Sequence, residues 1–309
     1  MHKTVLLFAG QGAQQVGMGK DLAEQFPTAR ALFDKAGDVL GYDLASLCFN
    51  GPEAELTKTN NAQPGIFLVS WVAFKLLRER VPSFTFQATA GLSLGEFTAL
   101  AAAGVMSFED GLSVVRQRGQ FMQEACEATR GAMAAIIGLD EAATRDVCRE
   151  AGVELANLNC PGQIVISGDS EKIGHACDLA KSRGAKRALA LTVAGAYHSR
   201  LMMGAQPKLQ AALAAIPLHL PAVQVISNVT AKPHGPASEI HARLVDQVTS
   251  PVRWEESIRH LLSEGFVRFI ELGPGTALSG FMRRIDKNAQ VLNVADVASF
   301  EMTVKALTQ

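Results

Sequence analysis

The sequence predicts an α/β protein in which a smaller domain interrupts a larger one. Short apolar, β-favouring runs alternate with segments of helical spacing along most of the chain, which indicates a parallel-type sheet. A middle segment departs from this alternation, and glycine-rich loops follow three of the expected strands. The chain has 309 residues, of which 48% are hydrophobic and 19% charged, so a sizeable core can be buried.

Residues 1–128 are expected to form the first part of the large domain. Thr4–Phe8 predicts a buried strand, because it is a short β-favouring run that ends at Gly10. A second strand, Thr85–Ala90, leads into a loop with two glycines and a serine. Helical spacing predicts helices at Lys20–Leu40, Ala62–Arg80, Glu96–Ala103 and about Phe108–Ala128.

Residues 129–196 are expected to form the small domain. Its predicted strands are Gly131–Leu139, Val153–Leu158, Gln163–Gly168 and Arg187–Val193, and its predicted helices are Glu141–Glu150 and Ser170–Arg183. The order β-α-β-β-α-β is the split βαβ, or ferredoxin-like, pattern. We therefore interpret this segment as a domain inserted into the larger one.

The large-domain pattern resumes over residues 197–309. The predicted strands are Val223–Ser227 and Val267–Glu271, and the predicted helices are Met202–Ala215, Glu255–Glu264 and Thr276–Ile285. The last of these helices is expected to be the final one of the chain.

Composition argues against several function classes. A net charge of −1 gives no indication of nucleic-acid binding. No apolar run reaches the roughly 18 to 20 residues of a membrane span, so we expect no membrane association. The five cysteines are odd in number and scattered without a CxxC pair, which predicts a cytoplasmic protein with neither a disulfide framework nor a metal site.

Ser93 is the strongest candidate for a catalytic residue. Gly91-Leu92-Ser93-Leu94-Gly95 matches G-x-S-x-G between a predicted strand and a predicted helix, which is typical of a nucleophile elbow. The glycines are needed because the turn is crowded, and the following helix N-terminus favours negative charge. The alternative is an ordinary glycine loop between a strand and a helix.

A serine nucleophile needs a base, and His198 is the best candidate among seven histidines. It lies in a loop of small residues where the inserted domain returns to the large one, and clefts form at such junctions. His175 falls in a predicted small-domain helix. The others lie near polar or Pro/Gly segments expected at the surface: His2, His219, His234, His241 and His260. A lone histidine is more often structural than catalytic.

Two further positions leave alternatives open. Gly10-Gln11-Gly12 follows the first strand and either belongs to a nucleotide loop, for which the third glycine is misplaced, or brings a backbone N–H close to a developing oxyanion. Arg118 lies in a fairly apolar part of its helix and points away from Arg116. It is either a solvated surface side chain or a buried one that needs a carboxylate partner.

Taken together, these residues resemble the malonyl-CoA:acyl-carrier-protein transacylase family of fatty-acid and polyketide synthesis. The similar blocks run almost end to end: FAGQGAQQVGMG (Phe8–Gly19), GPEAELTKTNNAQPGIF (Gly51–Phe67), GLSLGEFTALAAAG (Gly91–Gly104), RGQFMQEA (Arg118–Ala125), GAMAAIIGL (Gly131–Leu139), NCPGQIVISG (Asn159–Gly168), GAKRALALTVAGAYHSRLM (Gly184–Met202), SPVRW (Ser250–Trp254) and ELGPG (Glu271–Gly275). Two positions depart from the family, since Leu92 stands where it usually has His, and Ala9 where it usually has Pro.

The resemblance implies a fold and a set of roles. The large domain would be α/β-hydrolase-like. Ser93 would carry the acyl group and His198 would be its general base and acid, oriented by the backbone carbonyl of Gln247 instead of a carboxylate. The backbone N–H groups of Gln11 and Leu94 would form the oxyanion hole. By the same resemblance, Arg118 would bind the free carboxylate of a malonyl group.

The resemblance also implies substrates and partners. Malonyl-CoA would be the donor and the phosphopantetheine thiol of an acyl carrier protein the acceptor, with no bound cofactor or metal. Because carrier proteins are acidic, we expect docking on a basic rim of a monomer. Two basic patches are candidates for this rim. The first consists of Lys181, Arg183, Lys186 and Arg187, and the second of Arg283, Arg284 and Lys287. The alternatives are a hydrolase that uses the same Ser-His dyad and a carrier-docking module without activity.

Overall fold

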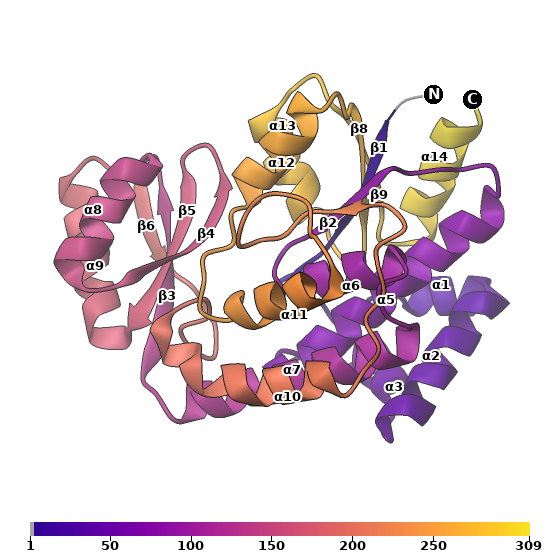
Figure 1. Cartoon of the computed structure of the whole chain (residues 1–309), viewed down its shortest axis with the longest axis horizontal. Coiled ribbons are helices and arrows are strands. Elements are labelled where there is room, and N and C mark those ends of the chain that lie inside the picture. The colour runs from indigo at the N-terminus through magenta and orange to yellow at the C-terminus, as the bar shows by residue number, and fades with distance from the viewer. Residues whose placement is uncertain (1–2) are drawn as a thin grey trace.

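A five-stranded parallel sheet lies at the centre of the larger part of the molecule (Figure 1). The computed structural model describes residues 3–309. The strand order is β7-β2-β1-β8-β9, and every neighbouring pair is parallel. The strands are β1 (Thr4–Phe8), β2 (Ala88–Gly91), β7 (Gln224–Val225), β8 (Arg268–Leu272) and β9 (Gln290–Val294). The predicted parallel-type sheet is confirmed.

Helices cover both faces of this sheet. They are α1 (Lys20–Gln25), α2 (Pro27–Leu40), α3 (Leu44–Asn50), α4 (Glu53–Leu56), α5 (Thr59–Arg80), α6 (Leu94–Ala102), α7 (Phe108–Glu127), the 3-10 helix η1 (Arg200–Ala205), α10 (Gln206–Ala214), α11 (Ala237–Asp246), α12 (Trp254–Ser263), α13 (Ala277–Ile285) and α14 (Val297–Thr308). Among residues 3–309, none of the helices has both the length and the apolar character needed to cross a membrane.

Strand β1 is buried along its whole length, which explains its unbroken apolar run. Successive side chains of a strand point to opposite faces. Leu6 and Phe8 pack into the core shared with α5, α6 and α7, whereas Val5 and Leu7 pack into a second core with residues of α12 and α13. A strand covered on both faces therefore reads as continuously apolar and not as alternating.

A four-stranded antiparallel sheet forms the smaller part, at one end of the long axis (Figure 1). Its strands are β3 (Gly131–Ile137), β4 (Glu154–Cys160), β5 (Gln163–Asp169) and β6 (Arg187–Ala190), in the order β4-β5-β3-β6. Helices α8 (Glu141–Ala151) and α9 (Ser170–Ser182) pack with Ala134, Ile136 and Ile166 in a separate core. This order and pairing confirm the ferredoxin-like pattern, while the boundaries at 128/129 and 196/197 stay predictions.

Several predicted elements are corrected by the structure. The helix expected over 20–40 is two helices, because Phe26, which precedes Pro27, is extended (φ −119°, ψ 119°). The helix expected from Met202 begins as 3-10 helix η1. The prediction that the helix ending at Ile285 is the last one is wrong, since β9 and α14 follow it.

Candidate active site

Ser93 sits in a strained turn between β2 and α6. Its backbone has φ 53° and ψ −102°, a conformation that a non-glycine residue rarely adopts. The two glycines of the motif make the turn possible, because a Cβ on Gly91 would lie 1.9 Å from the Gly95 carbonyl carbon and one on Gly95 would lie 2.1 Å from the Phe8 oxygen. The turn can therefore form only where both flanking positions lack side chains.

Gly95→Ala is expected to lower the free energy of unfolding by about 3 kcal/mol, because the new methyl group meets the rigid backbone of β1. Chemical denaturation of the two proteins measures the difference. Gly280→Ala is the matched control, since Gly280 lies in α13 with no heavy atom within 4 Å of its would-be Cβ. This control should gain up to about 1 kcal/mol, and an equal response of both variants would contradict the prediction.

The structure brings Ser93 and His198 together. His198 Nε2 lies 2.9 Å from Ser93 Oγ, and both residues are buried. His198 Nδ1 lies 2.9 Å from the carbonyl oxygen of Gln247 and 3.1 Å from that of Ser250. Because carbonyl oxygens only accept, Nδ1 carries the proton and Nε2 is left to accept the Ser93 hydroxyl proton. The arrangement fits a serine nucleophile paired with a base that a carbonyl orients.

The environment of His198 keeps its imidazole neutral. Burial and the nearby positive charge of Arg118 lower the pKa of His198 from 6.5 to about 4, against the opposing effect of the Gln247 and Ser250 carbonyls. A base must be unprotonated to act, so the imidazole can accept a proton at any pH well above 4.

The acylation rate is therefore expected to stay level as pH falls through 6.5 and to decline only near pH 4. The rate falls on the acid side because the lowered pKa keeps His198 unprotonated, and therefore able to act as a base, until the pH drops below that value. Rapid pH-jump mixing with a CoA ester of an uncharged acyl group measures the acylation rate at each pH before the protein can unfold. In Arg118→Gln the decline should move to higher pH, because the charge that depresses the pKa is gone; a decline centred at pH 6.5 in both proteins would contradict this account.

Arg118 is buried, which rules out the solvated alternative. Its Nη1 donates to Gln63 Oε1 at 2.7 Å, and its Nη2 donates to Gln247 Oε1 at 2.9 Å and to Ser93 Oγ at 3.1 Å. These acceptors are all neutral oxygens, so no carboxylate of the described residues hydrogen-bonds to Arg118. Burial lowers the pKa of Arg118, and the negative charge of Glu96, which is linked to Arg118 through the Gln247 amide, opposes that shift.

Two backbone N–H groups come from the loops and helix start that follow adjacent strands β1 and β2. Gln11 follows β1 and Leu94 follows Ser93, and β1 pairs with β2 so that Phe8 lies beside Gly91. Neither the Gln11 nor the Leu94 backbone N–H donates a hydrogen bond to another residue of the described chain. The first N–H groups of a helix have no intrahelical acceptor, so Leu94 is free to bind an oxyanion.

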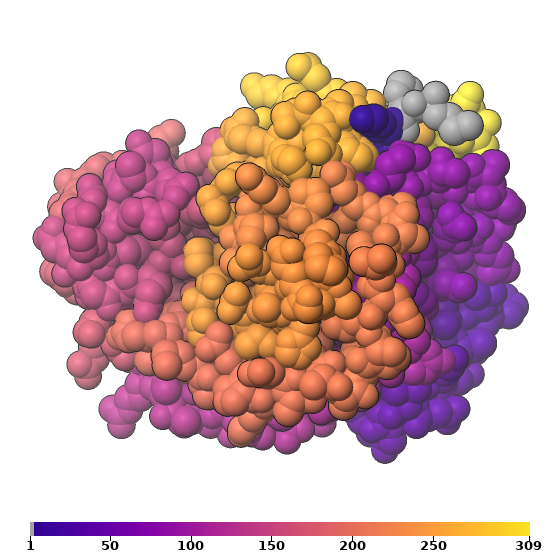
Figure 2. All heavy atoms as spheres, in the orientation of Figure 1, coloured from indigo at the N-terminus to yellow at the C-terminus, as the bar shows by residue number. Residues whose placement is uncertain are grey.

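A cavity of about 330 Å³ is lined by residues of both sheets and of the loops beside them. Ser93, His198, Arg118 and Gln11 lie on its large-domain side. The small sheet supplies the opposite wall with Met133, Ala135, Asn157, Asn159, Gln163 and Val165. In β3, the cavity-facing side chains alternate with those that pack under α8 and α9. In Figure 2, residues of the 200–260 region cover the front of the molecule beside the small domain.

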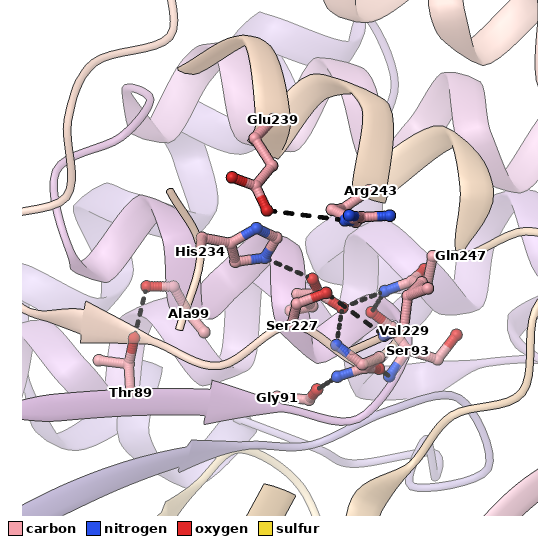
Figure 3. Close-up of polar contacts among 12 residues, drawn as sticks. Thr89, Gly91, Ser93, Ala99, Ser227, Val229, His234, Glu239, Arg243 and Gln247 are labelled. Atoms are coloured by element: carbon pink, nitrogen blue, oxygen red, sulfur yellow. Dashed lines mark hydrogen bonds and ion pairs between the residues drawn. The ribbon is translucent and has the colours of Figure 1, made fainter. Parts of the chain in front are cut away.

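A buried polar network under the elbow was missed from the sequence. Glu96, Asn228, His234 and Gln247 are all buried, and the last three each donate a hydrogen bond to Glu96. Figure 3 shows His234 and Gln247 of this network together with Ser93. The prediction that His234 lies at the surface is wrong, because its loop folds back on β7 and its backbone N–H donates to the Val225 carbonyl at 2.8 Å. Gln63 was also missed, because it follows a polar first turn, Thr59-Asn60-Asn61, and nothing in the local pattern sets it apart.

Comparisons with known proteins agree with this site. An acyl transferase domain model matches residues 5–302. A malonyl CoA-acyl carrier protein transacylase of Bacillus subtilis is 46% identical over 316 residues, which cover 100% of this chain and 98% of that protein.

Solved structures of the same kind superpose closely. The acyl-carrier-protein S-malonyltransferase of Bartonella henselae has a TM-score of 0.95 at 38% identity and covers 99% of this chain and 100% of its own. A malonyl-transacylase solved in complex with its type II PKS acyl-carrier protein has a TM-score of 0.95 at 39% identity, with 98% and 99% covered. The match of one family model to nearly the whole chain, together with these relatives, shows that the chain belongs to the acyl transferase family, in the group of the malonyl-CoA:acyl-carrier-protein transacylases.

Proposed function

We propose that this chain transfers a malonyl group from malonyl-CoA to the phosphopantetheine thiol of an acyl carrier protein, through an ester on Ser93. One observation carries the proposal: Ser93 Oγ lies 2.9 Å from a neutral base, His198, and 3.1 Å from a buried cation, Arg118. A nucleophile, its base and a carboxylate-binding group thus share one cavity.

The proposed reaction has two half-reactions of the same kind. His198 Nε2 takes the Ser93 proton while Oγ attacks the thioester carbonyl, and the N–H groups of Gln11 and Leu94 bind the oxyanion. The C–S bond breaks and the departing CoA thiolate receives the proton from His198. The carrier thiol then gives its proton to His198 and attacks the ester, and Ser93 leaves with that proton.

The preference for a malonyl cargo rests on Arg118. Burial lowers the pKa of Arg118 to about 10, so the guanidinium still carries its charge at neutral pH. A buried guanidinium with its planar fork suits a carboxylate, and its present acceptors are neutral oxygens that a carboxylate would outcompete. The chemistry proposed uses no metal or prosthetic group, and CoA and phosphopantetheine enter as parts of the substrates.

The proposed docking rim joins the two basic patches. A Cβ on Gly138 would lie 2.8 Å from the Lys186 side chain, and one on Gly162 would lie 3.7 Å from Gly138 and 3.9 Å from the Arg284 guanidinium. Arg284 also donates to Gln163 Oε1 at 2.7 Å, and Gln163 lines the cavity. This link between Arg284 and a residue of the cavity supports docking of an acidic carrier beside the cavity.

Two of the predicted rim residues are already paired with acidic side chains. Arg183 pairs with Glu150, and Lys181 with Asp178 at 3.4 Å, which leaves these two with less charge to offer. We further propose that the protein is a cytoplasmic monomer. The location is supported by the five cysteines, which are all buried free thiols.

Mass spectrometry of the intact protein after brief mixing with malonyl-CoA tests the function. A malonyl adduct on Ser93 that persists until a carrier protein removes it is expected. Release of free malonate without an acceptor would instead identify a hydrolase, and the absence of any adduct would identify a docking module. Competition with acetyl-CoA and methylmalonyl-CoA measures the cargo preference.

Arg118→Ala is expected to reduce kcat/KM for malonyl transfer by about 100-fold or more and to affect acetyl transfer far less, because only the malonyl group loses a charge-assisted pair. Acyl loading from each CoA ester measures the two rates. Arg116→Ala is the matched control from the same helix, since Arg116 lies over the Tyr42 ring, away from Ser93. An equal loss of kcat/KM for malonyl and acetyl transfer would contradict the proposal that Arg118 binds the malonyl carboxylate.

A further inference from the structure

A single buried carboxylate, that of Glu96, organises the underside of the elbow. Its Oε2 accepts from Gln247 Nε2 at 2.6 Å and from the Asn228 backbone N–H at 3.1 Å, and its Oε1 accepts from His234 Nε2 at 2.6 Å. Glu96 and Gln247 have no exposed surface. A buried carboxylate is tolerated only when its oxygens are satisfied, so each of these donors matters.

Two of these donor residues, Asn228 and Gln247, also form hydrogen bonds with the backbone at Ser93. Asn228 Oδ1 accepts from the Ser93 backbone N–H at 2.6 Å, and Asn228 Nδ2 donates to the Gly91 carbonyl at 2.8 Å. Gln247 Nε2 also donates to the Ser93 carbonyl at 3.0 Å. The peptide groups on both sides of the strained serine are thus held by the side chains of two residues, Gln247 and Asn228, that each donate to Glu96, Gln247 from its side chain and Asn228 from its backbone.

The same carboxylate sets the position of Arg118. Gln247 Nε2 faces two acceptors, Glu96 Oε2 and the Ser93 carbonyl, so the amide has only one satisfactory orientation. Its Oε1 then points to Arg118 Nη2 at 2.9 Å. The guanidinium that would receive a substrate carboxylate is therefore placed by an amide that Glu96 orients.

His234 completes the set as the partner of Glu96 Oε1. Its loop is pinned by the bridge between Ile226 and Pro233, and Asn228 belongs to the same loop. The carboxylate oxygen accepts, so Nε2 carries a proton, while Nδ1 has no hydrogen-bond partner among the described residues. The ring therefore makes one hydrogen bond, and that bond goes to Glu96.

We propose that His234 is a positioning residue for acyl transfer, which acts through Glu96 on the backbone of Ser93 and, through Gln247, on the guanidinium of Arg118. The cargo-selective part of this role rests on the proposed malonyl transfer. Loss of the His234 donor leaves one oxygen of a buried carboxylate unpaired. Glu96 then shifts toward other donors, and both groups that it orders move with it.

Three proteins test this role: the wild type, His234→Phe, which keeps a ring but removes the donor, and His234→Gln, which keeps a donor of similar reach. His234→Phe is expected to lower kcat/KM for malonyl-CoA by about 10- to 100-fold, since small misplacements of reacting groups are costly. The loss with acetyl-CoA should be smaller, because only Ser93 is then affected. His234→Gln should recover most of both losses.

A neutral serine-directed reagent, phenylmethylsulfonyl fluoride, supplies a readout independent of malonate and carrier. Its rate of reaction with Ser93 should fall in His234→Phe and recover in His234→Gln. All three proteins are compared at equal concentrations of folded protein, so a difference in rate does not come from unfolding. Equal rates and equal kcat/KM values for the Phe and Gln variants would overturn the proposal. If His234→Phe does not fold, His234→Ala takes its place with the same expected order.

The two proposals fail in different ways. A wild type that never takes up a malonyl group refutes the proposed function, yet the sulfonyl fluoride rates still decide whether His234 positions Ser93. Conversely, if the wild type forms the malonyl adduct and the His234 variants have the same reaction rates and kcat/KM values as the wild type, only the positioning role is refuted.

Discussion

Ser93→Gly is expected to abolish the malonyl adduct and all transfer, and to be more stable than Ser93→Ala by about 1 kcal/mol. The loss of activity follows from the missing hydroxyl. The difference in stability follows from the backbone, because φ 53° with ψ −102° strains any residue with a Cβ by roughly 1 to 3 kcal/mol. Part of this relief is offset by the greater freedom of glycine in the unfolded chain.

Intact mass after incubation with malonyl-CoA measures the adduct, and denaturant unfolding measures the stabilities. Ser93→Ala is the control that removes the hydroxyl and keeps the strain. An adduct on either variant would place the nucleophile elsewhere, and a glycine variant less stable than the alanine variant would show that the turn is not strained.

His198→Ala is expected to lower the rate of Ser93 acylation by about 10³- to 10⁴-fold, because no other group within reach of Oγ can take its proton. Arg118 remains, but a guanidinium is already protonated and only donates. Residual acylation should rise with pH, since hydroxide can replace the missing base. Single-turnover mixing with malonyl-CoA measures the rate.

His175→Ala is the matched control for that loss, since His175 is exposed on α9 of the small domain. It should leave the acylation rate unchanged. A similar rate in His198→Ala and His175→Ala would mean that the 2.9 Å contact between His198 and Ser93 is not catalytic.

The elbow could be predicted from the sequence because its determinants are local. Five consecutive residues encode the turn, and Gly91 and Gly95 are required by contacts within and next to that turn. His198 is different, since 105 positions separate it from Ser93. No local pattern joins the two, and the resemblance to a family was needed to pair them.

The network beneath the elbow could not be predicted for the same reason. Asn228 and His234 reach Glu96 across 132 and 138 positions. The Pro/Gly context of His234 indicated a surface loop, but whether such a loop faces solvent or folds back depends on tertiary contacts. Glu96 did leave a signal, because it is the one charged residue in an otherwise apolar helix, α6.

The C-terminal strand and helix were missed because their patterns are weak. Strand β9 (Gln290–Val294) lies at the sheet edge, and only Val294 in it is fully buried, so its apolar residues form no continuous run. The break at Phe26, in contrast, could have been found, since a residue before proline disfavours helical backbone.

The two walls of the cavity contribute different things, and this separation affects how such proteins can diversify. The reactive groups all belong to one wall, whereas Met133, Ala135 and Val165 come from the small sheet, whose opposite face packs against α8 and α9. Substitutions in that second wall reshape the space for the cargo without touching the hydrogen bonds of the first. Selection, or a protein engineer, can therefore change the size and shape of the acyl group that fits the cavity while Ser93, His198 and Arg118 are inherited unchanged.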